Sequence, residues 1–115
     1  MTRKEIKAQS ARYTKIVEWS DGDQCFVGSS PEIMLGGVHG NDEAKVYAEL
    51  CQAVEEMIEL IYADGRELPE PLAAKRFSGK FVLRVEPAIH RRLAAKALAA
   101  GESLNSFCVK KLSKA

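Results

Sequence analysis

The residues of this chain best suited to chemistry are the basic side chains of its last third, and the chemistry they suggest is binding to a polyanion. Residues 75–115 contain ten Lys and Arg residues and two acidic residues, a net charge of +8. Residues 13–74 contain three basic and thirteen acidic residues, a net charge of −10, and the first twelve residues add +3. This division of charge indicates that the C-terminal part meets a polyanion such as nucleic acid and the preceding part does not.

Carboxylates are the next candidates, because paired carboxylates can hold magnesium for hydrolysis. The relevant residues are Glu18, Asp21, Asp23 and Asp42. Asp21 and Asp23 flank a glycine in a predicted turn, which places both side chains in solvent. We therefore interpret none of these carboxylates as catalytic and expect no enzyme activity.

The histidines and cysteines also lack the spacing of a reactive or metal site. His39 has no nucleophile nearby in the sequence, and His90 lies beside two arginines, where a contact with phosphate or a place on a dimer surface suits it. The cysteines, Cys25, Cys51 and Cys108, form no C-x-x-C pair and are odd in number. We interpret them as small buried hydrophobes of a cytoplasmic protein and expect neither a metal nor another cofactor.

The N-terminal part reads as strands followed by one helix. Residues 1–12 lack apolar periodicity and are expected to be flexible, whereas residues 13–71 form a domain. Its pattern predicts strands at 13–19, 25–28 and 33–35, and a glycine-rich loop over 36–40. A helix capped by Asn41 then runs to residue 63 and ends before Gly65. The predicted apolar positions of this helix are Tyr47, Leu50, Cys51, Val54, Ile58 and Ile61.

The C-terminal part reads as a strand and two helices. Residues 72–79 contain a glycine and no periodicity, and they lie where the charge changes sign, so they are interpreted as a linker. Residues 80–85 alternate between two faces and predict a strand. A helix begins at Pro87 and ends before Gly101, and Ser103 caps a second helix. No segment resembles a secretory signal or a membrane span, so no membrane partner is expected.

A unit of fewer than 40 residues without a disulfide or metal does not bury a sufficient core alone. We therefore expect two copies to pair their strands as an antiparallel ribbon, giving a homodimer, or a tetramer made of two such dimers. The predicted dimer core is apolar throughout and consists of Phe81, Leu83, Val85, Ile89, Leu93, Leu104 and Phe107.

The opposite face of such a ribbon fits the major groove of double-stranded operator DNA. Lys80, Val82 and Arg84 are the residues predicted to contact bases. The predicted phosphate contacts are Lys75, Arg76, Ser103, Leu104 and Asn105, because the start of a helix offers free N–H groups and the two basic residues precede the strand. The alternative is an exposed strand whose charges only prevent aggregation.

These motifs resemble known families. Residues 78–85, with Pro87, His90, Leu93, Ala97 and 101–107, are similar to ribbon-helix-helix (Arc/MetJ-like) DNA-binding domains. Residues 16–21, 25–28, 31–32 and 65–71 resemble HicB-type antitoxins. The implied fold class is α+β, with a β-β-β-α domain likened to a degenerate RNase H fold followed by the dimeric ribbon-helix-helix.

The resemblance implies an antitoxin-like repressor that binds the operator of its own genes and sequesters a HicA-like, mRNA-cleaving toxin. The glycine-rich stretch 36–40 departs from the family pattern. Three alternatives stay open: a sequestration module with DNA binding secondary or lost, a ligand-gated repressor without a toxin partner, and a nuclease.

Overall fold

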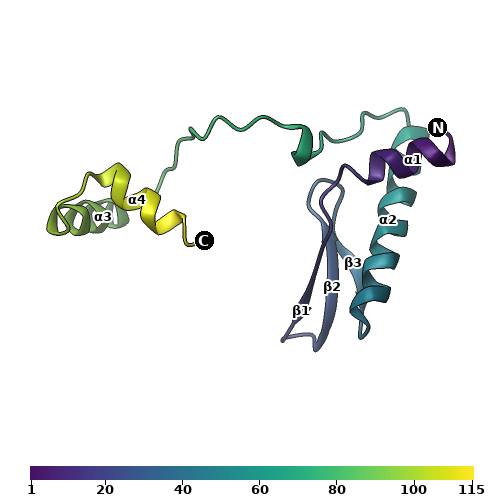
Figure 1. Cartoon of the computed structure of the whole chain (residues 1–115), viewed down its shortest axis with the longest axis horizontal. Coiled ribbons are helices and arrows are strands. Elements are labelled where there is room, and N and C mark those ends of the chain that lie inside the picture. The colour runs from purple at the N-terminus through teal and green to yellow at the C-terminus, as the bar shows by residue number, and fades with distance from the viewer. The chain divides into compact units, whose positions relative to one another are not determined.

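The computed structural model describes residues 1–115 as two units, residues 1–77 and 78–115 (Figure 1). The first unit contains α1 (Arg3–Ser10), β1 (Ile16–Ser20), β2 (Cys25–Ser30), β3 (Met34–Gly40), α2 (Glu43–Ala63) and a 3-10 turn, η1 (Leu72–Ala74). The second unit contains α3 (Pro87–Ala99) and α4 (Leu104–Leu112). None of these helices has the length and apolar character needed to cross a membrane.

The three strands form one antiparallel sheet in the order β1-β2-β3, followed by α2, as expected for an α+β chain with a β-β-β-α order. Gly28 in the central strand lies opposite Val17 on one side and Val38 on the other. A Cβ at Gly28 would lie 3.4 Å from side-chain atoms of Val46 and Leu50. The absence of a side chain there lets α2 pack closely on this face of the sheet.

The predicted loop over residues 36–40 is wrong, because these residues belong to β3. Gly28 pairs with Val38 and Ser30 pairs with Met34, so one residue of β2 faces three residues of β3. The extra residues form an irregularity in which Gly37 adopts a φ of +98°, a conformation that glycine reaches without strain. The glycines therefore bend a strand that local composition alone does not reveal.

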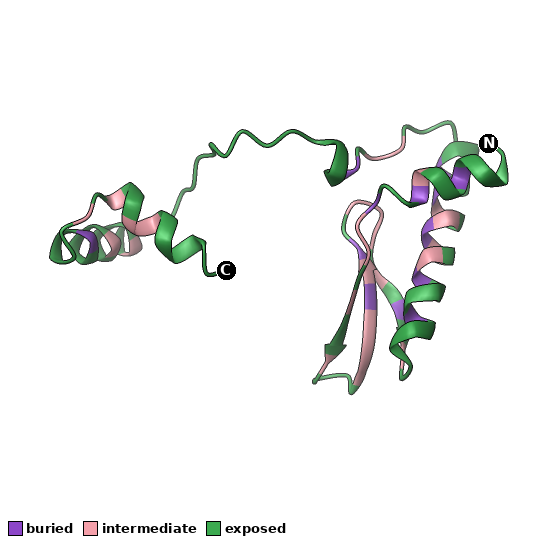
Figure 2. Ribbon diagram, viewed as in Figure 1, coloured by how far each residue is buried: buried purple, intermediate pink, exposed green.

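α2 supplies most of the core of the first unit. Its fully buried side chains are Val46, Leu50, Val54 and Ile58, each at most 1% exposed (Figure 2). The helix begins one residue later than predicted, since the Asp42 carboxylate, rather than Asn41, accepts a hydrogen bond from the backbone N–H of Lys45 at 3.2 Å. Of the predicted apolar face, Tyr47 is half exposed, and Val46 occupies the buried position instead.

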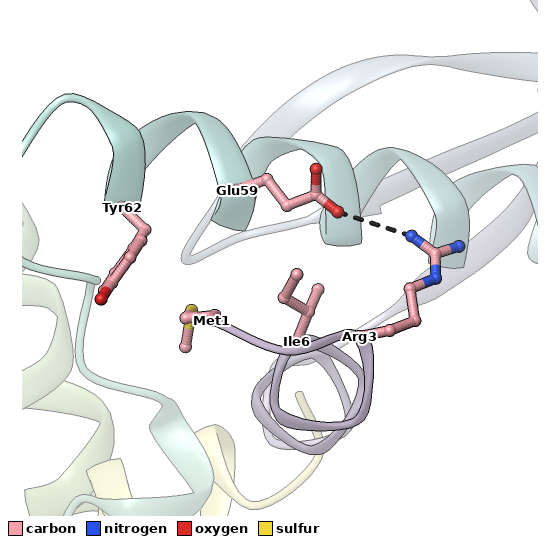
Figure 3. Close-up of a pocket in the computed structure, with 5 residues that line it drawn as sticks. All are labelled: Met1, Arg3, Ile6, Glu59 and Tyr62. Atoms are coloured by element: carbon pink, nitrogen blue, oxygen red, sulfur yellow. Dashed lines mark hydrogen bonds and ion pairs between the residues drawn. The ribbon is translucent and has the colours of Figure 1, made fainter.

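The N-terminal segment is a helix, not the flexible segment expected. Thr2 caps α1 by accepting a hydrogen bond from the N–H of Glu5 at 3.1 Å, and Ile6 is 5% exposed. Figure 3 shows Ile6 between α1 and α2, beside an exposed ion pair of Arg3 with Glu59 (N to O, 3.4 Å). Only one large apolar residue anchors this helix, so its sequence carries no periodicity.

Two side chains hold the segment after α2 against the rest of the first unit. The Tyr13 hydroxyl donates a 2.6 Å hydrogen bond to the carbonyl of Pro69, and the Glu32 carboxylate accepts from the N–H groups of Thr14 (3.2 Å) and Leu72 (3.1 Å). Burial alone would raise the pKa of Glu32, but these hydrogen bonds outweigh it and lower the pKa below its ordinary value. Leu72 is therefore the last residue of this segment that a hydrogen bond joins to a distant part of the first unit.

α3 has the predicted bounds within one residue, and α4 begins where predicted. α3 begins at Pro87, and its end is closed by hydrogen bonds from Gly101 N to Leu98 O (3.1 Å) and from Glu102 N to Ala97 O (2.9 Å). Gly101 has a φ of +69°, which this helix ending requires. Ser103 then caps α4, because its hydroxyl accepts from the N–H of Ser106 at 3.0 Å.

Residues 80–85, predicted to be a strand, have no regular secondary structure in the single chain. They are not helical either. A strand is defined by hydrogen bonds to a neighbouring strand, and the second unit contains no second extended segment to provide them. Pairing between two copies therefore stays a prediction.

Candidate nucleic-acid interface

An apolar groove runs between residues 79–85 and the two helices of the second unit. Its volume is about 900 Å³. Phe81, Leu83 and Val85 line it from the extended segment, and Leu93 and Leu104 line it from α3 and α4. Alternation along residues 80–85 identified the first three and helix periodicity the last two, but Lys80 and Arg84, predicted on the opposite face of the strand, line the groove as well.

The groove contains apolar side chains that the second unit does not cover. Phe81 is 73% exposed, Leu83 is 62% exposed and Val85 is 42% exposed. Within residues 78–115 the only buried residue is Ala97 (Figure 2). Burying one large apolar side chain contributes about 1.5–3 kcal/mol, so this unit leaves much of its available stabilisation unused.

The remaining predicted core residues divide into two groups. Ile89 and Phe107 are half buried but lie outside the groove. The groove instead includes Val109 and Leu112, which are 53% and 51% exposed and were absent from the predicted dimer core. The spacing of four residues between Cys108 and Leu112 is the sequence signal that could have added Leu112.

The predicted base-contacting residues are all exposed, but they do not share one environment. Lys80 and Arg84 line the groove, whereas Val82 is 84% exposed and does not line it. Neither Lys80 nor Arg84 forms an ion pair. Their charges are therefore available to an anionic partner.

The start of α4 has the geometry of an anion site. The N–H groups of the first helical residues, Leu104 and Asn105, have no acceptor within the helix. Ser103 turns its hydroxyl toward Ser106 as a cap, with the two hydroxyl oxygens 2.9 Å apart. Asn105 is exposed. The predicted phosphate contacts of this segment thus lie together at one helix end.

The basic side chains of this unit are mostly free of acidic neighbours. Lys110 pairs with Glu102, and this is the only ion pair within residues 78–115. Lys75 and Arg76, predicted to contact phosphate, are exposed and also lack an ion pair. The positive charge is consequently directed to solvent rather than neutralised within the chain.

Three of the four carboxylates considered for catalysis have structural partners, and the fourth, Glu18, is exposed on β1. Asp21 accepts a 2.9 Å hydrogen bond from the indole N–H of Trp19, and Asp23 accepts one of 3.1 Å from the Ser20 hydroxyl. Asp42 caps α2. No three His, Cys, Asp or Glu side chains are grouped as metal ligands. That the chain is not an enzyme stays a prediction.

A second hollow, between α1 and α2, has a volume of about 340 Å³ (Figure 3). Met1, Arg3, Ile6, Glu59 and Tyr62 line it. Its charged groups already pair with each other and remain exposed to water. This hollow therefore offers no chemistry comparable to that of the groove.

Comparison with known families gives one result. Residues 62–112 match the model of the HicB family. The HicB match begins at the end of α2 and covers the linker and most of the second unit, which is less than half of the chain. No curated protein and no solved structure matches the chain.

The HicB match supports a HicB-type family and, with it, a role related to toxin–antitoxin systems and a toxin partner in general terms. It includes residues 65–71, one of the stretches that carried the resemblance, and all the residues predicted to bind DNA. The strands of the first unit lie outside it.

Proposed function

We propose that this protein is an antitoxin-like transcriptional repressor that binds operator DNA as a dimer through residues 80–85. The proposal includes no catalytic step, metal or cofactor. Two copies of the extended segment pair as an antiparallel ribbon, whose inner face closes the groove and whose outer face enters the major groove of DNA.

The observation that carries the proposal is the groove beneath an extended segment in a unit with one buried residue. In a dimer, the partner's copies of Phe81, Leu83 and Val85 would fill this space. Association of two proteins costs about 4–15 kcal/mol. Six large apolar side chains at about 1.5–3 kcal/mol each offset that cost.

DNA binding follows from the charges that strand pairing would turn to the outer face of the ribbon, although Lys80 and Arg84 line the groove in the single chain. Lys80 and Arg84 can donate to guanine O6 and N7, and the methyl groups of Val82 can contact a thymine methyl. The start of α4 would hold a phosphate on each side of the two-fold axis. Lys75 and Arg76 add charge near the ends of the ribbon.

A mobility-shift titration tests this function. The probe is the DNA directly upstream of the chain's own reading frame, because repressors of this type act on their own operators. We expect sequence-specific binding whose affinity falls steeply with salt, since each neutralised phosphate contributes about −0.9 to the slope of log affinity against log salt. A flat salt response, or a protein that stays monomeric at micromolar concentration in sedimentation, would contradict the proposal.

The acidic first unit is proposed to hold a toxin. Residues 13–74 carry a net charge of −10, which complements a basic, RNA-binding partner. Co-expression with the adjacent reading frame tests this part: a small basic protein that copurifies with the full chain, and loses ribonuclease activity when bound, supports it. DNA binding without any such partner would favour a ligand-gated repressor, and copurification without DNA binding would favour a sequestration module.

A further inference from the structure

The segment that precedes the predicted ribbon has a composition suited to contact with DNA. Residues 75–80 read Lys-Arg-Phe-Ser-Gly-Lys, with three positive charges and no negative charge. Phe77 is 74% exposed, and its basic neighbours are exposed too. The hydrogen bonds of this segment are local: one closes η1 at Lys75, and the others join Ser78 to Lys80. The side chains of Arg76 and Phe77 are therefore free to meet a partner, whereas Lys75 lines a hollow of the first unit beside Glu32 and Glu70.

A defined turn separates these residues from the ribbon. Gly79 has a φ of +82°, which extended L-residues rarely adopt, and the Ser78 hydroxyl accepts a hydrogen bond from the N–H of Lys80 at 3.1 Å. Bonds from a serine hydroxyl to a backbone N–H two residues ahead favour turns over strands. The extended segment 80–85 thus begins at Lys80, directly after this turn.

We propose that residues 75–79 form a DNA arm that crosses the phosphate backbone beside the operator and places Arg76 in the flanking minor groove. This inference rests on the proposed function, because it takes residues 80–85 of two copies to lie in the major groove. Arg76–Gly79 can span at most about 14 Å. The major groove is about 12 Å wide, so an arm that starts within it reaches past the bordering phosphates.

The side chains of the arm match the chemistry of that position. A narrow minor groove over A·T pairs has an enhanced negative potential that attracts an arginine side chain. Lys75 then lies near the sugar–phosphate backbone, and the exposed ring of Phe77 gains apolar contact with the deoxyribose groups. The arm is short, because the N–H of Leu72 is bound by the Glu32 carboxylate at 3.1 Å.

The test compares two full-length double variants that lose the same charge. K75A/R76A removes the basic side chains of the arm, and K96A/K114A removes two exposed basic side chains elsewhere in the C-terminal part. On the upstream duplex we expect K75A/R76A to lower affinity at least about tenfold and to reduce the salt slope by roughly 3–4, since a dimer loses four charges. K96A/K114A should change both quantities much less.

A second measurement locates the arm on the DNA. Hydroxyl-radical footprinting with wild-type protein should show protected minor groove on both sides of the major-groove site, and K75A/R76A should lose only those flanks. Replacing flanking A·T pairs by G·C should weaken wild-type binding but leave K75A/R76A unchanged. Equal affinities of wild type and K75A/R76A, or equal losses in both double variants, would overturn the arm alone. Failure of the wild type to bind would overturn the proposed function, and the arm with it.

Discussion

The two units of this chain bury apolar surface in opposite ways. In the first unit, four side chains of α2 are at most 1% exposed and pack against a three-stranded sheet. In the second unit only Ala97 is buried, although its extended segment carries Phe81, Leu83 and Val85. The first unit therefore completes its own core, whereas the second leaves its apolar residues along an open groove, which a second copy closes in the proposed dimer.

The two units also differ in whether their charged side chains have partners within the chain. In the first unit, Asp21 and Asp23 accept hydrogen bonds in the turn after β1, and Asp42 caps α2. The basic residues of the second unit, apart from Lys110, form no ion pair. The first unit thus uses these polar groups within its own fold, whereas most basic side chains of the second unit are exposed and form no ion pair, which supports the proposed binding of a polyanion.

The substitution with the largest expected effect is Leu83→Ala. It tests whether the groove of the second unit is a dimer interface. We expect it to weaken the dimer by roughly 3–6 kcal/mol, because each copy loses one apolar side chain. Sedimentation velocity over a range of concentrations measures this change. The matched control is Leu98→Ala, since Leu98 is 82% exposed in the same unit and does not line the groove. Equal behaviour of the two variants would contradict the predicted interface.

Leu50→Ala tests whether the first unit is stabilised by its own core, without a partner. Leu50 is fully buried, so its truncation should lower the free energy of unfolding of the first unit by about 2–5 kcal/mol, independent of protein concentration. Urea unfolding followed by the fluorescence of Trp19, the only tryptophan, reports on this unit. Leu35→Ala is the control, because Leu35 is 85% exposed in β3 and should change stability by less than about 0.5 kcal/mol. A concentration-dependent loss would mean that the first unit also needs a partner.

Arg84→Ala separates DNA binding from folding. We expect a loss of about 1–3 kcal/mol in operator affinity and relaxed specificity at one base position, with the dimer and the first unit unchanged. Binding to a panel of single-base operator variants measures both effects. Arg92→Ala, on the exposed surface of α3, removes the same charge from a residue with no predicted base contact. An Arg84→Ala protein that binds as tightly and selectively as wild type would remove the base-reading assignment.

Glu32→Gln has the smallest expected effect, about 1 kcal/mol of stability in the first unit, because a charged acceptor of backbone N–H groups becomes neutral. The pKa of Glu32 is lower in the folded protein than its ordinary value of 4.5. Its ionised form therefore favours folding: the contribution is complete above the unfolded pKa and is lost as pH falls through the folded pKa. Urea unfolding of wild type and variant between neutral and acid pH measures this.

The pH dependence also distinguishes Glu32 from other carboxylates. The difference in stability between wild type and Glu32→Gln should shrink toward zero in acid. Glu18→Gln, at an exposed position of β1, should show little difference at any pH. A constant difference across the pH range would assign the effect of Glu32→Gln to packing rather than to charge.

Local signals explain why the helices could be predicted. α2 and α3 end two residues before Gly65 and Gly101, whose φ angles are +70° and +69°, and α4 begins directly after its Ser103 cap. Such caps depend on residues adjacent in the chain, so the sequence contains all the information. α1 escaped prediction because one residue, Ile6, holds it on a surface that α2 provides.

Part of the candidate site was also predictable, because strand alternation and helix periodicity depend on residues close together in the chain. Alternation along residues 80–85 identified the apolar residues that line the groove, and helix periodicity identified Leu93 and Leu104. The contribution of Val109 depends on how α4 packs beside α3, and the bond between Glu32 and Leu72 joins residues forty positions apart. No local pattern encodes such contacts.

The sequence by itself determined the separation of charge, the helix ends and the alternation of the extended segment, because each depends on residue type and on neighbours a few positions away. The tertiary structure alone decided that residues 36–40 complete a strand, that residues 3–10 form a helix and that residues 68–72 are bound to the first unit. These features arise from packing between distant segments, where the free energy comes from surfaces that form only after the chain has folded.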